Sequence, residues 1–247
     1  MSSIKPALLG FILVVAACSL LFWAEGRAVK TARALDEGKG IVIEVDAQAI
    51  APGNAGKLVH ISGDAVPQDV PVDTRLAVSA EGAARLVRVV EMLQWKETER
   101  DVERTGTDGK TTMTKVFDYE KTWSNSEIDS SKFKTASAPK NPPMPLTGET
   151  FEIIEAKIGA FRLAGDAVAA LSQNAPLQLT DAGIGQTAAA VGGTNPVWLV
   201  NNQYVAAADP DNPRAGDLRI RFERGDVSRL SAIGQQTGDK QIGRAHV

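Results

Sequence analysis

An uninterrupted run without a charged residue covers residues 7–24, and Lys5 and Glu25 bracket it. Coiled as a helix at about 1.5 Å per residue, this run would span roughly 27 Å, close to the hydrocarbon thickness of a bilayer. The Lys5 ammonium can reach the headgroup region, and Trp23 is typical of the membrane interface. We therefore predict an N-terminal transmembrane anchor over residues 1–24, with the rest of the chain facing water.

Two other interpretations of this run stay open. A basic start and an apolar run also describe a cleaved signal peptide, but this run is long for one and ends in Phe22-Trp23 rather than in small residues. Val15-Ala16-Ala17-Cys18 has the small residues that precede a lipidated cysteine, although apolar residues continue beyond Cys18. Both patterns fit less well than an anchor.

Charge and cysteine content narrow the function classes. The net charge is −3, which does not indicate binding to nucleic acid. The single cysteine lies inside the predicted anchor, so we expect neither disulfides nor thiol chemistry in the water-facing part. Arg27, Lys30 and Arg33 follow the anchor, whereas Lys5 alone precedes it. This bias favours a cytoplasmic domain, but long domains often cross the membrane regardless of charge.

The water-facing part is expected to be predominantly β (α+β). Good helix formers over residues 25–38 predict a juxtamembrane helical stalk, and residues 39–241 then form the β-rich domain. A short helix capped by Asp166 is expected over residues 166–172, and the prolines make residues 141–145 irregular. Short strands are expected over residues 40–45, 57–63, 150–163, 198–206 and 218–222.

A long hairpin is the most specific structural expectation. Residues 85–103 and 112–123 are rich in β-branched and aromatic residues, and Asp108-Gly109 between them is a strong signal for a two-residue turn. Such a turn pairs Thr107 with Lys110. Counting outward, it places Trp95 opposite Thr122 and Gln94 opposite Trp123, so that the two tryptophans point to opposite faces.

The residues that carry chemistry form no recognisable site. His60 alternates with apolar residues on an expected strand, which is typical of a structural histidine, and His246 is the only other histidine. Gly192-Gly193-Thr194 lacks the lysine of a phosphate loop. Asp129-Ser130-Ser131 resembles a helix cap.

Glu91 and Glu97 share one face of their strand, where glutamates are usually solvated. We predict no catalytic, cofactor-binding or metal-binding residue and no enzyme activity. Trp95 and Trp123 suit either core packing or contact with a membrane surface.

Several segments, in this order and at these spacings, resemble the transmembrane protein 43 family, also called LUMA. The resemblance covers about residues 24–239. The segments that carry it are Glu25–Ala32, Gly56–Gly63, Val90–Trp95 with Glu97, Trp123, Ser126–Ile128, Ser131–Phe133, Lys140–Pro142, Ile158–Phe161 and Gly216–Ile220.

The resemblance implies a multi-pass membrane protein whose large domain lies on the non-cytoplasmic side. Eukaryotic members lie in the endoplasmic reticulum and the inner nuclear membrane, where they organise proteins such as emerin and lamins. A bacterial member would lie in the inner membrane with its domain in the periplasm. No enzyme activity or cofactor comes with the family. We follow this orientation over the charge count.

The end of the chain carries a further expectation. The family continues beyond Asp239 into more membrane helices, and residues 242–247 resemble a translated sequencing adapter. We therefore expect a truncated chain with a non-native tail.

The sequence leaves three functions to weigh. A membrane scaffold would bind the bilayer, other membrane proteins and a second copy of the chain. A lipid- or glycan-binding module is the first alternative. A membrane-surface hydrolase is the second, and it would have to bring Glu91, His60 and Asp129 together.

Overall fold

The computed structural model describes residues 42–105, 111–193, 195–237 and 241–246, together with Val14 and Ala17, which are helical. Among these residues no helix is both long and apolar enough to cross a membrane. The rest of the predicted anchor, the predicted stalk over residues 25–38, and the proposed Asp108-Gly109 turn lie outside the described residues. These three expectations stay predictions.

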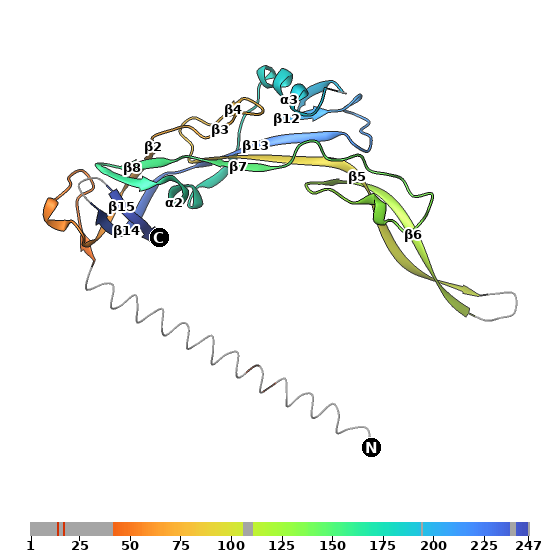
Figure 1. The fold of residues 1–247 in the computed structure, drawn as a ribbon, viewed down its shortest axis with the longest axis horizontal. Coiled ribbons are helices and arrows are strands. Elements are labelled where there is room, and N and C mark those ends of the chain that lie inside the picture. The colour runs from red at the N-terminus through yellow and green to blue at the C-terminus, as the bar shows by residue number, and fades with distance from the viewer. Residues whose placement is uncertain are drawn as a thin grey trace.

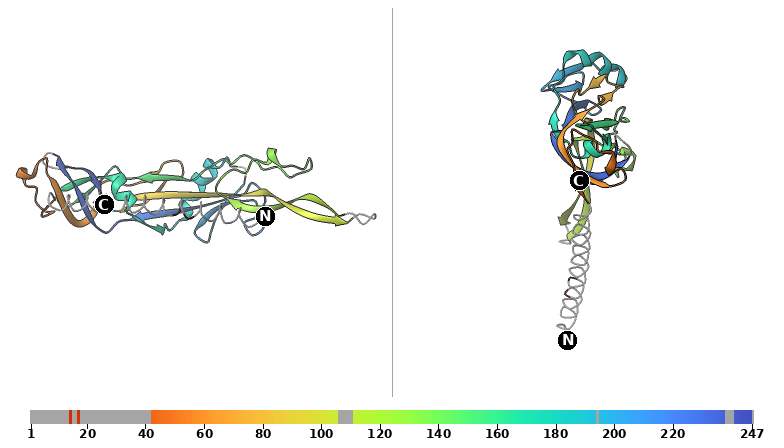
Figure 2. Two further views of the ribbon diagram at one scale, coloured as in Figure 1. Left: turned by 90° about the horizontal axis from the view of Figure 1, so that it is seen from below. Right: turned by 90° about the vertical axis from the view of Figure 1, so that its left-hand side faces the viewer.

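The described part is predominantly β, as expected, and it is elongated, with two main sheets (Figures 1 and 2). One sheet, which we call the closed sheet, has the order β1-β2-β14-β15-β9-β8. Because β8 also pairs with β2, strands β2, β14, β15, β9 and β8 form a ring. The bounds are β1 Ile43–Glu44, β2 Leu58–Pro67, β8 Glu155–Ile158, β9 Phe161–Ala164, β14 Arg229–Thr237 and β15 Gln241–His246.

Alternation along β2 explains the core of the closed sheet. Val59, Ile61 and Ala65 are buried, whereas the intervening side chains face outward. The inward residues pack with Phe161, with other apolar residues of β8 and β9, and with helix α2 (Gly165–Ala170). The core of this sheet therefore lies inside the ring.

The second sheet, which we call the long sheet, runs along the length of the molecule (Figure 1). Its order is β11-β12-β13-β5-β6, while β10 pairs with β13 and β7 pairs with β5. The two-stranded sheet β3-β4 and the helix α3 (Ile184–Ala190) lie beside it. The bounds are β3 Val72–Asp73, β4 Val78–Ser79, β5 Arg85–Thr105, β6 Thr111–Ser124, β7 Glu149–Glu152, β10 Gln173–Pro176, β11 Val197–Val200, β12 Gln203–Ala206 and β13 Leu218–Asp226.

One face of the long sheet is buried and the other is largely open. Leu86, Val90 and Met92 of β5 point into a core with Ile220 and Tyr204, whereas the alternate residues of β5 are only partly buried. Such alternation is typical of an antiparallel sheet with one solvated face.

A buried ion pair fixes the β3-β4 turn to this core. The Arg88 guanidinium is 2% exposed and donates to the Asp73 carboxylate and, at 2.8 Å, to Glu149. Asp73 Oδ1 also accepts from the backbone N–H groups of Arg75 and Leu76, so each charge is compensated. Burying such a pair is tolerable only because its hydrogen bonds are satisfied.

The long hairpin is confirmed in its two strands, but its predicted register is wrong by one residue. Thr105 pairs with Thr111, so residues 106–110 separate the paired ends. Trp95 consequently lies opposite Lys121, and Trp123 lies opposite Leu93. A shift of one residue turns the side chains of one strand to the other face relative to its partner. Both tryptophans therefore point to the same, open face of the sheet.

Three other segments differ from expectation. The strand expected over residues 150–163 is three strands, because Gly159 adopts a φ of +57° and turns the chain between β8 and β9. The strand expected over residues 198–206 is the β11–β12 hairpin, turned by Asn201 and Asn202, both with positive φ. Helix α2 begins at Gly165 with Ala164 as its N-cap, so Asp166 lies in the first turn instead of capping it.

One smaller expectation is confirmed, and the bounds of three predicted strands differ. Residues 141–145 are irregular, as predicted. The first strand is only Ile43–Glu44, whereas β2 continues past the predicted end to Pro67. Strand β13 likewise extends beyond the expected residues, to Asp226.

Candidate functional site

Strands β5 and β6 leave the body of the molecule as a two-stranded projection (Figure 1, lower right). We call residues 96–105 and 111–121 the ribbon. Strand β6 ends the order of the long sheet, and its pairing with β5 runs without a bulge over its whole length. The ribbon therefore presents a long outer backbone edge, which among described residues pairs with nothing. Such edges are templates for pairing with another chain.

The base of the ribbon is held by an irregular segment, residues 125–141. The Asn141 side chain imitates a strand partner for β5, because its Oδ1 accepts from Trp95 N at 2.7 Å and its Nδ2 donates to Trp95 O at 2.9 Å. Nδ2 also donates to Ile128 O at 3.1 Å. Gln94, which is fully buried, bonds to the backbone of Ser126 and Ile128. These amides connect the segment to the ribbon.

The same base is braced from β13. Gly216 donates to Leu93 O at 2.8 Å and has a φ of +100°. A Cβ at Gly216 would lie 2.9 Å from Pro142, so the close approach requires a glycine. Asp217 closes the turn by accepting from Arg214 N at 2.6 Å.

Charged and aromatic groups meet on the open face beside the base. Glu91 Oε2 accepts from Arg219 at 2.7 Å and from Arg221 at 3.1 Å. The Arg219 guanidinium lies 4.5 Å from the centre of the Trp123 ring, within range for a cation–π interaction. The hydrogen bond from Arg219 is the largest influence on Glu91 and lowers the pKa of its carboxyl. Glu91 is thus an ionised structural group.

The two faces of the ribbon differ in charge. On the face shared with Trp95, which we call the acidic face, β5 carries four carboxylates and β6 adds the ammonium groups of Lys115 and Lys121. Met113, 63% exposed, and Phe117 lie on the same face. The opposite face has three cations and two carboxylates. The four acidic-face carboxylates belong to Glu97, Glu99, Asp101 and Glu103.

The residues expected to carry chemistry do not come together. Glu91 and Glu97 share one face, as predicted, but Glu97 accepts from Tyr119 and from Lys134 N instead of facing Glu91. Asp129 accepts from Ser131 and N-caps a 3-10 turn, Ser130–Lys132. His60 lies on β2 in the other sheet, where Nε2 bonds Ser231 at 2.6 Å. The hydrolase constellation is therefore not formed.

Metal and cofactor sites were not predicted. The described residues contain no group of three His, Cys, Asp or Glu side chains that could hold a metal. Residue 194 of the Gly192-Gly193-Thr194 segment and the side chain of His246 lie outside the described residues.

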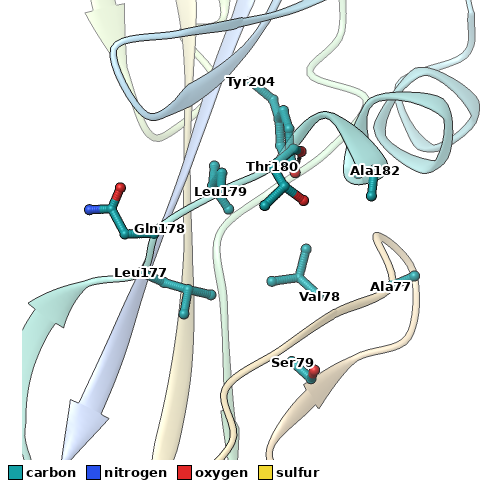
Figure 3. A pocket seen from close by; sticks show the side chains of 10 residues that line it. Ala77, Val78, Ser79, Leu177, Gln178, Leu179, Thr180, Ala182 and Tyr204 are labelled. Atoms are coloured by element: carbon teal, nitrogen blue, oxygen red, sulfur yellow. Dashed lines mark hydrogen bonds between the residues drawn. The ribbon is translucent and has the colours of Figure 1, made fainter.

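A cavity of about 200 Å³ lies between the β3-β4 turn and the segment before α3 (Figure 3). Val78, Leu177 and Leu179 supply its apolar walls, and no charged side chain lines it. The Tyr204 hydroxyl donates to Thr180 O at 2.7 Å, and burial raises the pKa of this hydroxyl. The cavity has no group poised for acid–base chemistry at neutral pH.

The sequence was compared with known protein families, and the matched region includes the base of the ribbon. The profile of the transmembrane protein 43 family matches residues 92–244, which include the ribbon, its base and strands β8, β9 and β14 of the closed sheet. The chain belongs to the transmembrane protein 43 family. No solved structure matches the chain.

Relatives from animals match nearly the whole sequence. Transmembrane protein 43 of Rattus norvegicus is 30% identical over 96% of this chain and 56% of its own length. The Homo sapiens protein is 30% identical over 92% of this chain and 53% of its own. The homolog of Drosophila melanogaster is 27% identical over 96% and 62%. The chain thus spans little more than half the length of these relatives.

The sequence motifs that carried the resemblance now have a physical role. Gln94-Trp95, Ser126–Ile128, Asn141-Pro142 and Gly216-Asp217 are far apart in sequence but meet at the base of the ribbon. In the sequence alone these segments indicated only the family resemblance. An asparagine in an irregular segment was a usable signal, because its side chain carries both an acceptor oxygen and a donor NH2 group, as a backbone peptide does.

Proposed function

We propose that this family member is a membrane-anchored scaffold whose ribbon binds other membrane proteins. The relatives are named transmembrane proteins, and residues 7–24 have the length and polarity of a membrane anchor. The observation that carries the proposal is the ribbon itself, a long β-projection with an unpaired edge and unequal charge on its two faces.

The ribbon contributes little to the stability of the fold, which favours a role in binding. An isolated two-stranded hairpin is marginally stable in water, and only cross-strand pairs such as Arg100–Asp118 and Lys115–Glu99 support its outer half. The partner that fits it is an extended segment with basic and apolar residues in alternation. Such a segment would lie along the acidic face with its cations beside the β5 carboxylates and away from Lys115 and Lys121 of β6, whose charge would repel them.

The domain lies on the non-cytoplasmic side of the membrane in this proposal, in the periplasm if the host is bacterial. A cysteine at the exposed position 113 tests the orientation, because the native Cys18 lies in the anchor. Labelling of Met113→Cys by an impermeant maleimide in intact spheroplasts is the expected result. Labelling only after lysis would place the domain in the cytoplasm.

Crosslinking in membranes tests the scaffold itself. A photoreactive residue at Met113 should capture discrete partners from native membranes, whereas one at Ile154, which is 84% exposed but distant from the ribbon, should not. The double change Asp101→Lys and Glu103→Lys should abolish capture by reversing charge on the acidic face. The matched change Arg104→Glu on the opposite face should preserve it. Equal capture by both charge variants would refute the proposed binding mode.

A further inference from the structure

A second concave site lies on the outside of the closed sheet, on a different sheet from the ribbon. It is a pocket of about 400 Å³ formed where β2 and β8 pair. This volume is in the range of small-molecule sites. The polar or charged side chains of Gln48, Asp64, Gln68 and Lys157 line it beside the 54% exposed Val66.

Two glycines leave bare backbone in the pocket lining, and both are required by packing. A Cβ at Gly63 would lie 2.7 Å from the Ile158 side chain. A Cβ at Gly159 would lie 2.2 Å from Ala47 O, and the φ of +57° favours glycine there. The pocket shape is therefore built into the turn between β8 and β9 and does not depend on a mobile side chain.

One cation and one anion are available in this pocket. Within the described part of the chain, the Lys157 ammonium and the Asp64 carboxylate make neither a hydrogen bond nor an ion pair. The register places Val66 opposite Lys157, so Asp64 is the diagonal neighbour of Lys157 on the same face. The Cβ atoms of such diagonal neighbours lie roughly 7 Å apart. The Gln68 amide is held at the rim by the carbonyls of Val66 and Pro67.

Opposite charges at this spacing suit a ligand that carries both signs. Lysine binds phosphate as a point charge, and a carboxylate accepts hydrogen bonds from a primary ammonium. Arg229 lies opposite Asp64 on β14 but is not one of the residues that line the pocket. A quaternary ammonium has no N–H to donate, so a choline group would satisfy Asp64 less well.

We propose that this pocket binds a phosphoethanolamine zwitterion, with its phosphate at Lys157 and its ammonium at Asp64. The closed sheet contains β1, the first described strand after the predicted anchor, so the pocket belongs to the sheet that follows the anchor in sequence. The chemistry itself is shared by a lipid headgroup and by the free zwitterion. The inference does not depend on the ribbon or on its partners.

The test uses the full chain solubilised in a neutral detergent. Native mass spectrometry counts adducts with short-chain phosphatidylethanolamine, phosphatidylcholine and phosphatidylglycerol, and calorimetry measures free O-phosphoethanolamine. A charge-assisted hydrogen bond contributes about tenfold or more in affinity. Lys157→Gln and Asp64→Asn should each weaken ethanolamine binding by about that factor, and Lys96→Gln on the ribbon should leave it unchanged.

The outcomes separate the two sources of the ligand and the proposal from its rivals. Binding of phosphatidylethanolamine alone identifies a lipid site, and binding of the free zwitterion as well identifies a headgroup site open to solutes; both support the proposal. Equal binding of ethanolamine and choline lipids would overturn it. So would preference for phosphatidylglycerol with no effect of Asp64→Asn, or intact folded variants that bind as the parent does.

Discussion

Replacing Asn141 tests whether one side chain holds the base of the ribbon. Asn141→Ala removes three hydrogen bonds, two to the backbone of Trp95 and one to Ile128 O. At a net contribution of about 0.5–1.5 kcal/mol each, the free energy of unfolding should fall by about 3 kcal/mol. For a domain of about 200 residues this lowers the thermal midpoint by roughly 6–12 °C.

The assay is thermal unfolding of the full chain in detergent, followed by tryptophan fluorescence. Asn125→Ala is the matched control, because Asn125 is exposed in the adjoining segment, and it should shift the midpoint by no more than about 1 °C. Asn141→Asp should also be destabilising, since a carboxylate oxygen would face the carbonyls of Trp95 and Ile128. A loss for Asn141→Ala as small as that of Asn125→Ala would refute the reasoning.

Three further perturbations follow from the structure. Gly165→Ala should destabilise strongly in thermal unfolding, because its Cβ would lie 1.9 Å from a backbone carbonyl, whereas Gly185→Ala in the open helix α3 should be neutral or slightly stabilising. Arg88→Met should cost about 3–5 kcal/mol in urea unfolding, because it strands the buried Asp73 carboxylate. The lowered pKa of Glu91 means that its ion pairs stabilise the fold above the ordinary carboxyl pKa of 4.5 and are lost as pH falls through its folded value. Glu91→Gln should therefore flatten the pH dependence of the thermal midpoint in that acid range, and an unchanged slope would contradict the assignment.

The sequence was most informative where alternation was strong. Strands β5 and β6 were predicted almost to their ends, because β-branched and aromatic residues recur through both. The register failed since it rested on one turn. The pairing of Thr105 with Thr111 differs from the predicted register by one residue, which puts Trp95 and Trp123 on one face instead of on opposite faces.

Local signals missed in the sequence explain two other errors. Asn201-Asn202 is a turn sequence that tolerates positive φ at both positions, and it was absorbed into a strand. Gly159 interrupted the segment expected as a single strand over residues 150–163 in the same way. All three residues were visible as breaks but were given less weight than the apolar residues around them.

The closed sheet and the candidate site depended on information that periodicity does not contain. Strand β14 pairs with β2 although Ser231 and Ser62 are far apart in the chain, and nothing local announces such a pairing. The base of the ribbon likewise forms where the side-chain amides of Gln94 and Asn141 and the backbone N–H of Gly216 bond to distant backbone groups. The family resemblance identified these segments before their contact was known, because packing constraints leave motifs even where the sequence shows no chemistry.

Shortening the ribbon tests the scaffold proposal most directly. Thr98 pairs with Asp118, so deleting residues 99–117 and joining these two by Asn-Gly should leave a two-residue hairpin on an intact body. Partners that copurify with the full chain from native membranes should be lost from this variant, while its thermal midpoint stays within a few degrees of the parent. Retention of the same partners by a folded, ribbon-shortened chain would contradict the central claim that the ribbon is the binding surface.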